Sequence, residues 1–366
     1  MKSKKRIFLF ALLGLVVLCL AAAGISTLSN RALPAAPQST GRLEALDKQR
    51  LVEAIHLRQA LGGLVWPGFG QADIPIIVWN RNDSFLVGLP QAPKGWQAVS
   101  GDEFEGQPYF YQKSKDPQNF AVPVDGAWAA SMATKSETDS FLIEMFRNFL
   151  PPVIKTIFPY RLVIQPSEVQ ISGVAHESFH VLQQMNTPER LAAAEQAHKL
   201  GDGYRQADKT MAEDWRNEID LLYQAVNAEK DSEAARLARV FLDGRQVRRE
   251  KANLPLDLVD YERQLEWEEG LAKYIELAIW RMAYEHTGYI PILMDDPDFK
   301  GYRTFPQRLK QELDQMKRQA EQAGETRLYY TGMAQALLLD RLSPGWKDRA
   351  FEQGVWVEDL LRQAVR

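Results

Sequence analysis

The sequence predicts an α+β protein, with a β-rich N-terminal subdomain, a mainly helical C-terminal part and an N-terminal transmembrane helix. Three observations support this prediction. An unbroken apolar run of nineteen residues lies near the start of the chain. Short β-type segments separated by Gly, Pro, Asn and Asp fill the stretch from residue 64 to about residue 134. From residue 188 onward, apolar residues recur mostly at helical spacing.

The length and composition fit a globular protein. A chain of 366 residues can form two modest domains with ample core, and an apolar content of 45% is ordinary. The net charge is −4, from 44 basic and 48 acidic residues. Four of the basic residues and none of the acidic ones fall within the first thirty positions, so the rest is more acidic still. Nucleic-acid-binding domains are usually basic, so we expect no nucleic-acid partner.

Residues 1–30 are predicted to be a signal anchor. Lys2 to Arg6 is positively charged, and the apolar run Ile7 to Ile25 is about long enough to cross a bilayer. A cleaved signal peptide usually has a shorter apolar core, which favours an uncleaved anchor. Cleavage at Ala21-Ala22-Ala23 remains the alternative. In either case the positive end stays in the cytoplasm, and the bulk of the chain is expected on the periplasmic side of the cell envelope.

Cysteine usage agrees with a bacterial envelope location. Cys19 is the only cysteine, so the exported part has no disulfide, which a larger envelope protein tolerates better than a small secreted domain. Residues 31–61 are predicted to be a spacer followed by an amphipathic helix, and residues 62–165 a β-rich subdomain with an antiparallel sheet. That sheet is either a scaffold or offers an edge strand to an extended peptide. Residues 166–366 form the predicted helical domain.

A His-Glu-x-x-His motif lies at the start of this helical domain. His176 and His180 are four residues apart on a predicted helix from Ile171 to Gln183, so both imidazoles face the same side and can bind one metal ion. Glu177, next to the first histidine, can act as a general base on a water at that metal. The alternative is a pair of buried core histidines. The motif therefore predicts a catalytic zinc site that still needs a third ligand.

A carboxylate is the best candidate for the third ligand, because none of the other three histidines follows His180 at a suitable spacing. On a second predicted helix, Leu265 to Glu276, the residues Glu269 and Glu276 lie on the apolar stripe. A carboxylate there is costly unless it is paired or binds a metal. We assign Glu269 as the ligand and Glu276 as a partner that orients a ligand. The alternative is an ion pair with an arginine such as Arg281 or Arg245.

Other charged residues of this region are expected to be solvated. Glu266 shares a helix face with Glu262 and Lys273, away from the apolar stripe. A basic cluster precedes the helix and is either a solvated face, a counterweight to acids near the metal, or a binding site for a substrate carboxylate. The cluster consists of Arg245, Arg248 and Arg249. His198 and His286 are expected on the surface.

Two further segments resemble the gluzincin metallopeptidases, especially the aminopeptidase N and glycyl aminopeptidase families. Glu268 to Glu276 is similar to their Asn-Glu-Gly-Phe-Ala-x-Tyr-x-Glu block, and Tyr329 to Gly332 is similar to their Tyr-x-Lys-Gly segment. The resemblance implies a zincin-like fold and a zinc ion bound by Glu269 together with the two histidines of the motif. It also implies that Tyr329 stabilises the oxyanion of the reaction. Tyr330 is then a packing residue, unless both tyrosines are.

The chain also departs from those families. Between His180 and Glu269 lie 88 residues, far more than in the aminopeptidase N families. Thr331 replaces the family lysine, and no Gly-x-Met-Glu-Asn segment precedes His176 to grip a free amino terminus. We therefore expect a zinc peptidase acting on peptides or proteins, without a prediction of end specificity or oligomeric state. The alternatives are a zinc-binding envelope protein without turnover and a zinc hydrolase of a non-peptide amide.

Overall fold

A computed structural model describes residues 23–31, 33–34, 39–115, 117–293 and 295–366. The protein is α+β, as predicted, with one six-stranded sheet and an otherwise helical chain among these residues. Most of the predicted membrane anchor, residues 1–22, falls outside the described residues. Within the described ranges, no helix is both long enough and apolar enough to cross a membrane.

The sheet is mixed, with the strand order β3-β4-β2-β1-β6-β5. The prediction of an antiparallel sheet was wrong for one pair, because β1 and β6 run parallel while the other neighbours are antiparallel. The alternation of apolar residues identifies a strand but says nothing about the direction of its neighbour. The strands are β1 (Ile76–Trp79), β2 (Asp83–Val87), β3 (Gln97–Ala98), β4 (Phe110–Lys113), β5 (Phe120–Val124) and β6 (Ala127–Ala133).

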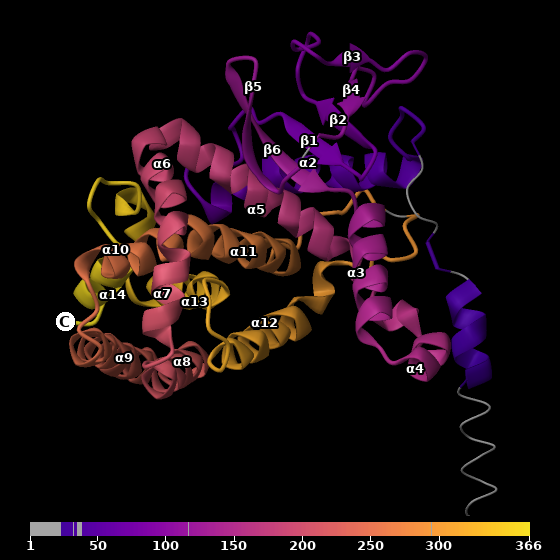
Figure 1. The fold of residues 1–366 in the computed structure, drawn as a ribbon. Coiled ribbons are helices and arrows are strands. Elements are labelled where there is room, and N and C mark those ends of the chain that lie inside the picture. The colour runs from indigo at the N-terminus through magenta and orange to yellow at the C-terminus, as the bar shows by residue number, and fades with distance from the viewer. Residues whose placement is uncertain (1–22, 32, 35–38, 116, 294) are drawn as a thin grey trace, which may run out of the picture.

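Helices build the rest of the protein (Figure 1). Those that precede, carry or directly follow the motif are α2 (Ala45–Val65), α3 (Lys135–Phe149), α4 (Pro152–Ile157), α5 (Ser167–Asn186) and α6 (Pro188–Ala197). The next are α7 (Gly201–Asp208), α8 (Ala212–Asn227), α9 (Asp231–Lys251), α10 (Leu256–Leu265) and α11 (Leu271–Glu285). The last are α12 (Phe305–Gln319), α13 (Thr326–Leu342) and α14 (Val357–Ala364).

These elements form layers around α5. The sheet lies at one end of the molecule, α5 and α11 run across the middle, and α8, α9 and α12 lie at the opposite end (Figure 1). The largest cluster of buried apolar side chains is continuous from α2 through the sheet and α5 to α11, α13 and α14. Helix α5 thus packs against strands β5 and β6 of the sheet and against helices α2 and α11.

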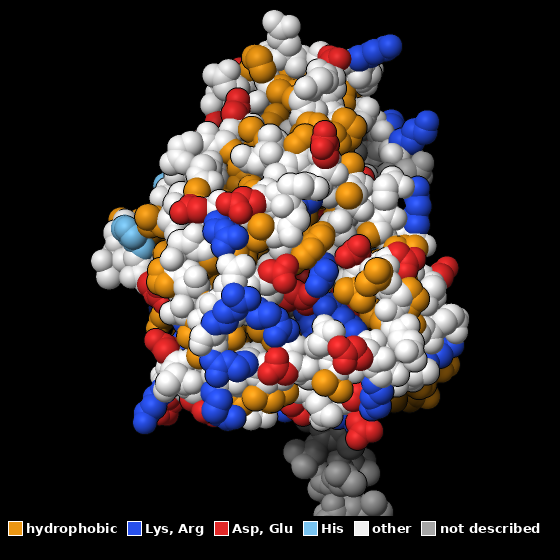
Figure 2. All heavy atoms as spheres, turned by 90° about the vertical axis from the view of Figure 1, so that its left-hand side faces the viewer, with side chains coloured by type: hydrophobic (Ala, Val, Ile, Leu, Met, Phe, Trp, Pro, Cys, Tyr) orange, Lys and Arg blue, Asp and Glu red, His pale blue; other side chains and the backbone are white. Residues whose placement is uncertain are grey.

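The outer surface shows mixed charge. Figure 2 views the side of the molecule that carries α6, α9, α10 and α14, and there basic and acidic side chains are interspersed. That face presents no continuous basic surface of the kind that tracks a nucleic-acid backbone.

Candidate metal centre

The two motif histidines lie on adjacent turns of α5, where the helix passes beneath the sheet. Their ring centroids are 5.0 Å apart, and the rings are nearly perpendicular. The side chain of His180 is fully buried and that of His176 is 13% exposed. The ring of His180 also packs against Phe120 at the start of β5, with centroids 4.5 Å apart. The helical spacing of the motif therefore placed both imidazoles on one face, as predicted.

The predicted second helix is not continuous. Residues Glu266–Gly270 form a π-helical turn, η3, between α10 and α11. A π-turn inserts one extra residue and shifts the faces that its side chains occupy. Glu266 therefore points to one side of the turn, toward Arg245, whereas Glu268 and Glu269 point toward histidines. Side chains that a regular helix would spread around its axis are thus divided between two separate buried clusters.

Two glycines allow the site to close around this turn. A Cβ added to Gly270 would lie 2.7 Å from the Cα of Gly332, and one added to Gly332 would lie 2.6 Å from the carbonyl oxygen of Glu266. Neither position can hold a side chain unless the backbone moves. Gly270 and Gly332 thus form the crossing point of η3 and α13. This crossing brings Tyr329 close to Glu269.

One oxygen of Glu269 lies between the two imidazoles. Its Oε2 is 3.3 Å from Nε2 of His176 and 3.6 Å from Nε2 of His180. Metal bonds of about 2.0–2.2 Å at tetrahedral angles separate neighbouring ligand atoms by about 3.3–3.6 Å. The Nε2 atom of His180 is buried and has no hydrogen-bond partner. The three residues assigned from the sequence therefore come together with a spacing and a free lone pair that fit a zinc ion.

Each histidine is oriented through its other ring nitrogen. Gln183, one turn further along α5, accepts a hydrogen bond from Nδ1 of His180 at 2.9 Å. The amide group of Gln183 donates to the carbonyl oxygens of Trp267 and Glu268, at 3.0 and 3.3 Å. It thus ties the histidine to η3. In a neutral imidazole held this way, Nε2 is the unprotonated nitrogen, which is the form a metal needs. The sequence analysis missed Gln183, although its spacing of three from His180 could have identified it.

Glu276 lies on the corresponding side of His176. Its Oε2 lies 3.8 Å from Nδ1 of His176. The carboxylate also accepts from Lys273 and Arg308, both at 2.9 Å. Burial raises the pKa of Glu276, but Lys273, His176 and Arg308 outweigh it and hold that pKa well below its usual range. Glu276 therefore stays charged, and it lies where the sequence analysis expected a residue that orients a ligand.

The general-base candidate is almost completely buried beside the histidines. The side chain of Glu177 follows His176 on α5, and the residue is 8% exposed. Burial raises the pKa of Glu177 to about 7, against the opposing effect of the two histidines. A carboxylate with a pKa near neutrality can both take and return a proton at physiological pH.

The two tyrosines at the start of α13 point to different places, as the helical geometry predicts. The hydroxyl of Tyr329 interacts with Glu269, and burial and the nearby carboxylates raise its pKa above the usual range. Tyr330 instead interacts with Glu312, among the ion pairs that surround Glu276. Tyr329 thus borders the group formed by His176, His180 and Glu269, whereas Tyr330 lies against the charged residues around Glu276.

A second polar group adjoins the first. Nε2 of His198 lies 3.0 Å from Oε2 of Glu268, and its Nδ1 lies 3.3 Å from Oε2 of Glu325. Glu268 is fully buried. His198 was expected on the surface, and 32% of its side chain is exposed, but its ring is also paired with two carboxylates. His286 is exposed, as expected. No local pattern pairs His198 with Glu268, because the contact joins segments 70 residues apart.

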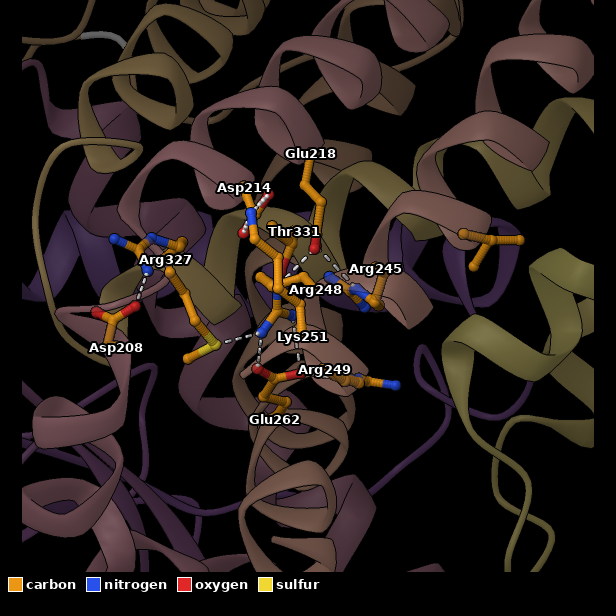
Figure 3. A network of polar contacts seen from close by, with 12 residues as sticks. Asp208, Asp214, Glu218, Arg245, Arg248, Arg249, Lys251, Glu262, Arg327 and Thr331 are labelled. Atoms are coloured by element: carbon orange, nitrogen blue, oxygen red, sulfur yellow. Dashed lines mark hydrogen bonds and ion pairs between the residues drawn. The ribbon is translucent and has the colours of Figure 1, made fainter. Parts of the chain in front are cut away.

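The prediction of a solvated face for Glu266, Glu262 and the three arginines was also wrong. Arg245 makes a bidentate pair with Glu266, with both distances 2.8 Å, and Arg248 pairs with Glu262 at 2.7 and 3.0 Å. Figure 3 shows part of this network, with Arg248 paired to Glu262 and Arg245 directed toward Glu218. The network also contains Glu218, Arg249 and Glu358. The seven side chains are at least 93% buried because each charge meets an opposite one.

The alternative for Glu269 and Glu276 was an ion pair with an arginine such as Arg281 or Arg245, and the two glutamates differ in this respect. Arg245 binds Glu266 and Arg281 binds Asp340, so neither arginine neutralises Glu269. Glu269 instead pairs with the two motif histidines, and the hydroxyl of Tyr329 also interacts with it. Glu276 does form ion pairs, but with Lys273 and Arg308.

Comparison with known proteins yields no relative: no family model, no curated protein and no solved structure matches this chain. The functional argument therefore depends on the side-chain geometry described above.

Proposed function

We propose that the protein is a membrane-anchored, extracytoplasmic zinc metallopeptidase with a zincin-like active site. The proposal rests chiefly on one arrangement: two histidines direct their Nε2 atoms at a single oxygen of Glu269. Gln183 holds His180 through Nδ1, and the carboxylate of Glu276 lies 3.8 Å from Nδ1 of His176. An ion-paired structural carboxylate has no need of two imidazoles in this orientation. A closed structural zinc site would have a fourth protein ligand and no use for Glu177 as a base.

The residues of the site divide the reaction among them. His176, His180 and Glu269 would hold the zinc ion, which would supply the positive charge that acidifies a water and polarises the scissile carbonyl. Glu177 takes a proton from the attacking water and later passes it to the leaving amine. Tyr329 donates a hydrogen bond to the oxyanion that forms at the carbonyl. Gln183 and Glu276 keep the two imidazoles in the orientation that the other steps require.

The edge of the sheet offers a place for the substrate chain. Strand β5 pairs with β6 on one side only among the described strands, and its first residue, Phe120, packs on His180. An extended peptide can add to such an edge through main-chain hydrogen bonds. The substrate class that suits this edge is a peptide or an unfolded protein segment.

The decisive experiment measures turnover of a quenched fluorescent peptide library by the purified protein, with and without a chelator. We expect cleavage that stops with the chelator and returns with zinc. Glu177→Gln should keep zinc and lose cleavage, whereas Glu195→Gln, on the exposed face of α6, should behave like the wild type. Equal cleavage by wild type and Glu177→Gln would refute a hydrolase. Zinc binding without cleavage of any peptide would favour a binding protein or the hydrolysis of a non-peptide amide.

The location can be tested separately. We expect protease added to intact spheroplasts to digest the part after residue 30, because the positive N-terminal end remains in the cytoplasm. Digestion only after lysis would mean that the domain faces inward.

A further inference from the structure

The neighbourhood of Glu268 contains an unsatisfied buried charge. Glu268 is fully buried in η3; its Oε2 atom faces His198, but its Oε1 atom has no hydrogen-bond partner. Leaving one oxygen of a buried carboxylate without a partner is costly, because the oxygen has lost its hydrogen bonds to water and has gained none from the protein. The arrangement therefore suggests that something absent from the polypeptide contacts Glu268.

We propose a second divalent-cation site, formed by His198, Glu268 and Glu269, that shares Glu269 with the zinc site. One ligand atom from each of these residues lies within 4.8 Å of the others. Glu325, next to Nδ1 of His198, can orient that imidazole as Glu276 orients His176. One nitrogen and two carboxylate oxygens suit zinc, manganese or a similar ion. This inference rests on the proposed zinc site, because Glu269 would bridge the two ions.

A bridged pair of ions would change the chemistry of the site. Paired metal ions in hydrolases lie about 3.5–4 Å apart and stabilise the attacking and leaving groups together. The competing explanation needs no ion: a protonated His198 would form a closed ion pair with Glu268 and Glu325. The two explanations differ in metal stoichiometry.

Metal analysis of the full-length protein, saturated with zinc and freed of excess, distinguishes them. We expect two zinc ions per chain in the wild type and one in both His198→Ala and Glu268→Gln. His286→Ala, which removes an exposed histidine, should retain two. X-ray absorption of the wild type should show a metal–metal distance of about 3.5–4 Å that both variants lack. Thermal melting checks that the variants are folded.

One zinc ion in the wild type, unchanged by His198→Ala or Glu268→Gln, would overturn the second site and leave the first intact. No zinc in the folded wild type would overturn both. A loss of both ions in Glu268→Gln alone would show that this substitution disturbs the neighbouring Glu269. In that case one zinc ion in His198→Ala would support the second site, and two would overturn it.

A separate observation concerns the opposite side of the molecule. Helix α4 has no buried residue, although its sequence is mostly apolar. Large apolar side chains around it are between 61% and 85% exposed. We call these residues the α3–α4 apolar surface: Ile25, Leu28, Phe141, Phe149, Val153 and Leu162. Exposed apolar side chains that occur singly are normal, but a group of this kind on neighbouring segments marks a contact with a partner or a membrane.

Hydrogen bonds join the parts of this surface. The hydroxyl of Ser26 donates to the carbonyl oxygen of Ile157 at 2.5 Å. The side-chain amide of Asn30 donates to the carbonyl oxygen of Phe158 at 2.8 Å. The backbone N–H of Tyr160 in turn donates to Asn30 at 3.0 Å. The helical residues 23–31 therefore lie against the end of α4, beside α3 (Figure 1).

We infer that the α3–α4 apolar surface lies on a lipid bilayer. The apolar run that begins at Ile7 continues directly into residues 23–31, so the chain enters this surface from the predicted membrane segment. Exposed Arg147 on α3 and Lys155 on α4 lie on the same helices as the apolar residues, and their charge complements anionic headgroups. Apolar residues flanked by cations are typical of an interfacial surface rather than of a protein docking site.

Fluorescence quenching tests this contact in the full-length protein reconstituted into vesicles of phosphatidylglycerol and phosphatidylethanolamine. In a Cys19→Ala background, an environment-sensitive label would be attached at Phe149→Cys or Val153→Cys. The control is Leu256→Cys, which is equally exposed, at 82%, but lies at the start of α10. We expect lipid-borne quenchers to reduce the fluorescence at 149 and 153 at least severalfold more than at 256. Equal quenching at all three positions would overturn the inference.

Discussion

The π-turn η3 separates two buried polar clusters. Each is built around a glutamate of the turn, but the glutamates have different partners. On one side, Glu266 meets Arg245 and the hydroxyl of Thr331. On the other side, only three residues away, Glu269 meets two imidazoles. Guanidinium groups remain charged at any physiological pH and satisfy a carboxylate with fixed donors, so the first cluster is closed.

The second cluster is open, because a neutral imidazole can leave a lone pair free. In this cluster, Nε2 of His180 has no hydrogen-bond partner. The comparison teaches that burial of a carboxylate does not by itself indicate a functional site. The identity of the partners decides: arginine closes a site for stability, whereas histidines held through Nδ1 leave it ready for a metal.

The largest expected difference between the clusters appears when each loses its central glutamate. Glu269→Ala should remove stoichiometric zinc, because three protein ligands become two. Glu266→Ala should keep zinc but lower the free energy of unfolding by about 3–5 kcal/mol, because Arg245 loses its bidentate partner in the core. Metal analysis and urea denaturation measure the two effects. If Glu266→Ala strips the metal while Glu269→Ala retains it, the proposed division of η3 is wrong.

The next expected effect concerns the tyrosine that borders the open cluster. Tyr329→Phe removes only a hydroxyl and should reduce kcat about 100- to 1,000-fold, with little change in KM. Zinc content and melting temperature should stay near those of the wild type. Tyr330→Phe is the matched control and should cleave peptides normally. Full turnover in Tyr329→Phe would remove the oxyanion role while leaving the zinc ligands in place.

A smaller effect is expected from the residue that orients His176. Glu276→Gln should lower zinc affinity or turnover about 10- to 100-fold, because a neutral amide holds the imidazole less firmly. Glu312→Gln, in the same group of ion pairs with Lys273 and Arg308 but without a histidine contact, should affect stability more than zinc affinity. Competition with a zinc chelator of known affinity gives the comparison. Equal zinc affinities in the two variants would contradict the orienting role.

The smallest expected effect is the acid response of the closed cluster. The pKa of Glu358 is lowered from 4.5 to about 2, because Arg249 and Arg245 outweigh burial. A lowered folded-state pKa stabilises the protein above the unfolded value, and this contribution is lost as the pH falls from 4.5 toward 2. Denaturation measured across this range should show a shallower loss of stability in Glu358→Gln than in the wild type. If the free energy of unfolding has the same pH dependence in Glu358→Gln and in the wild type, the charge of Glu358 does not contribute to stability.

The sequence by itself determined the parts of the site that depend on short-range periodicity. Spacing of four on a helix places His176 and His180 together whatever surrounds them, and Glu177 follows from the same motif. The apolar stripe and the family-like block led to Glu269 and Glu276, and a rotation of about a hundred degrees between neighbours separated Tyr329 from Tyr330. The α+β composition followed from the change between period-two and helical patterns.

Only the tertiary structure decided which charged residues are buried and with whom. The solvated face predicted for Glu266 is a core ion pair, because a π-turn breaks the regular helical spacing on which that prediction relied. His198 meets Glu268 because α6 and η3 are packed together, and the parallel pairing of β1 with β6 depends on chain crossings that no local pattern records. These contacts join residues far apart in the chain, and a periodicity of two or 3.6 residues carries no information about them.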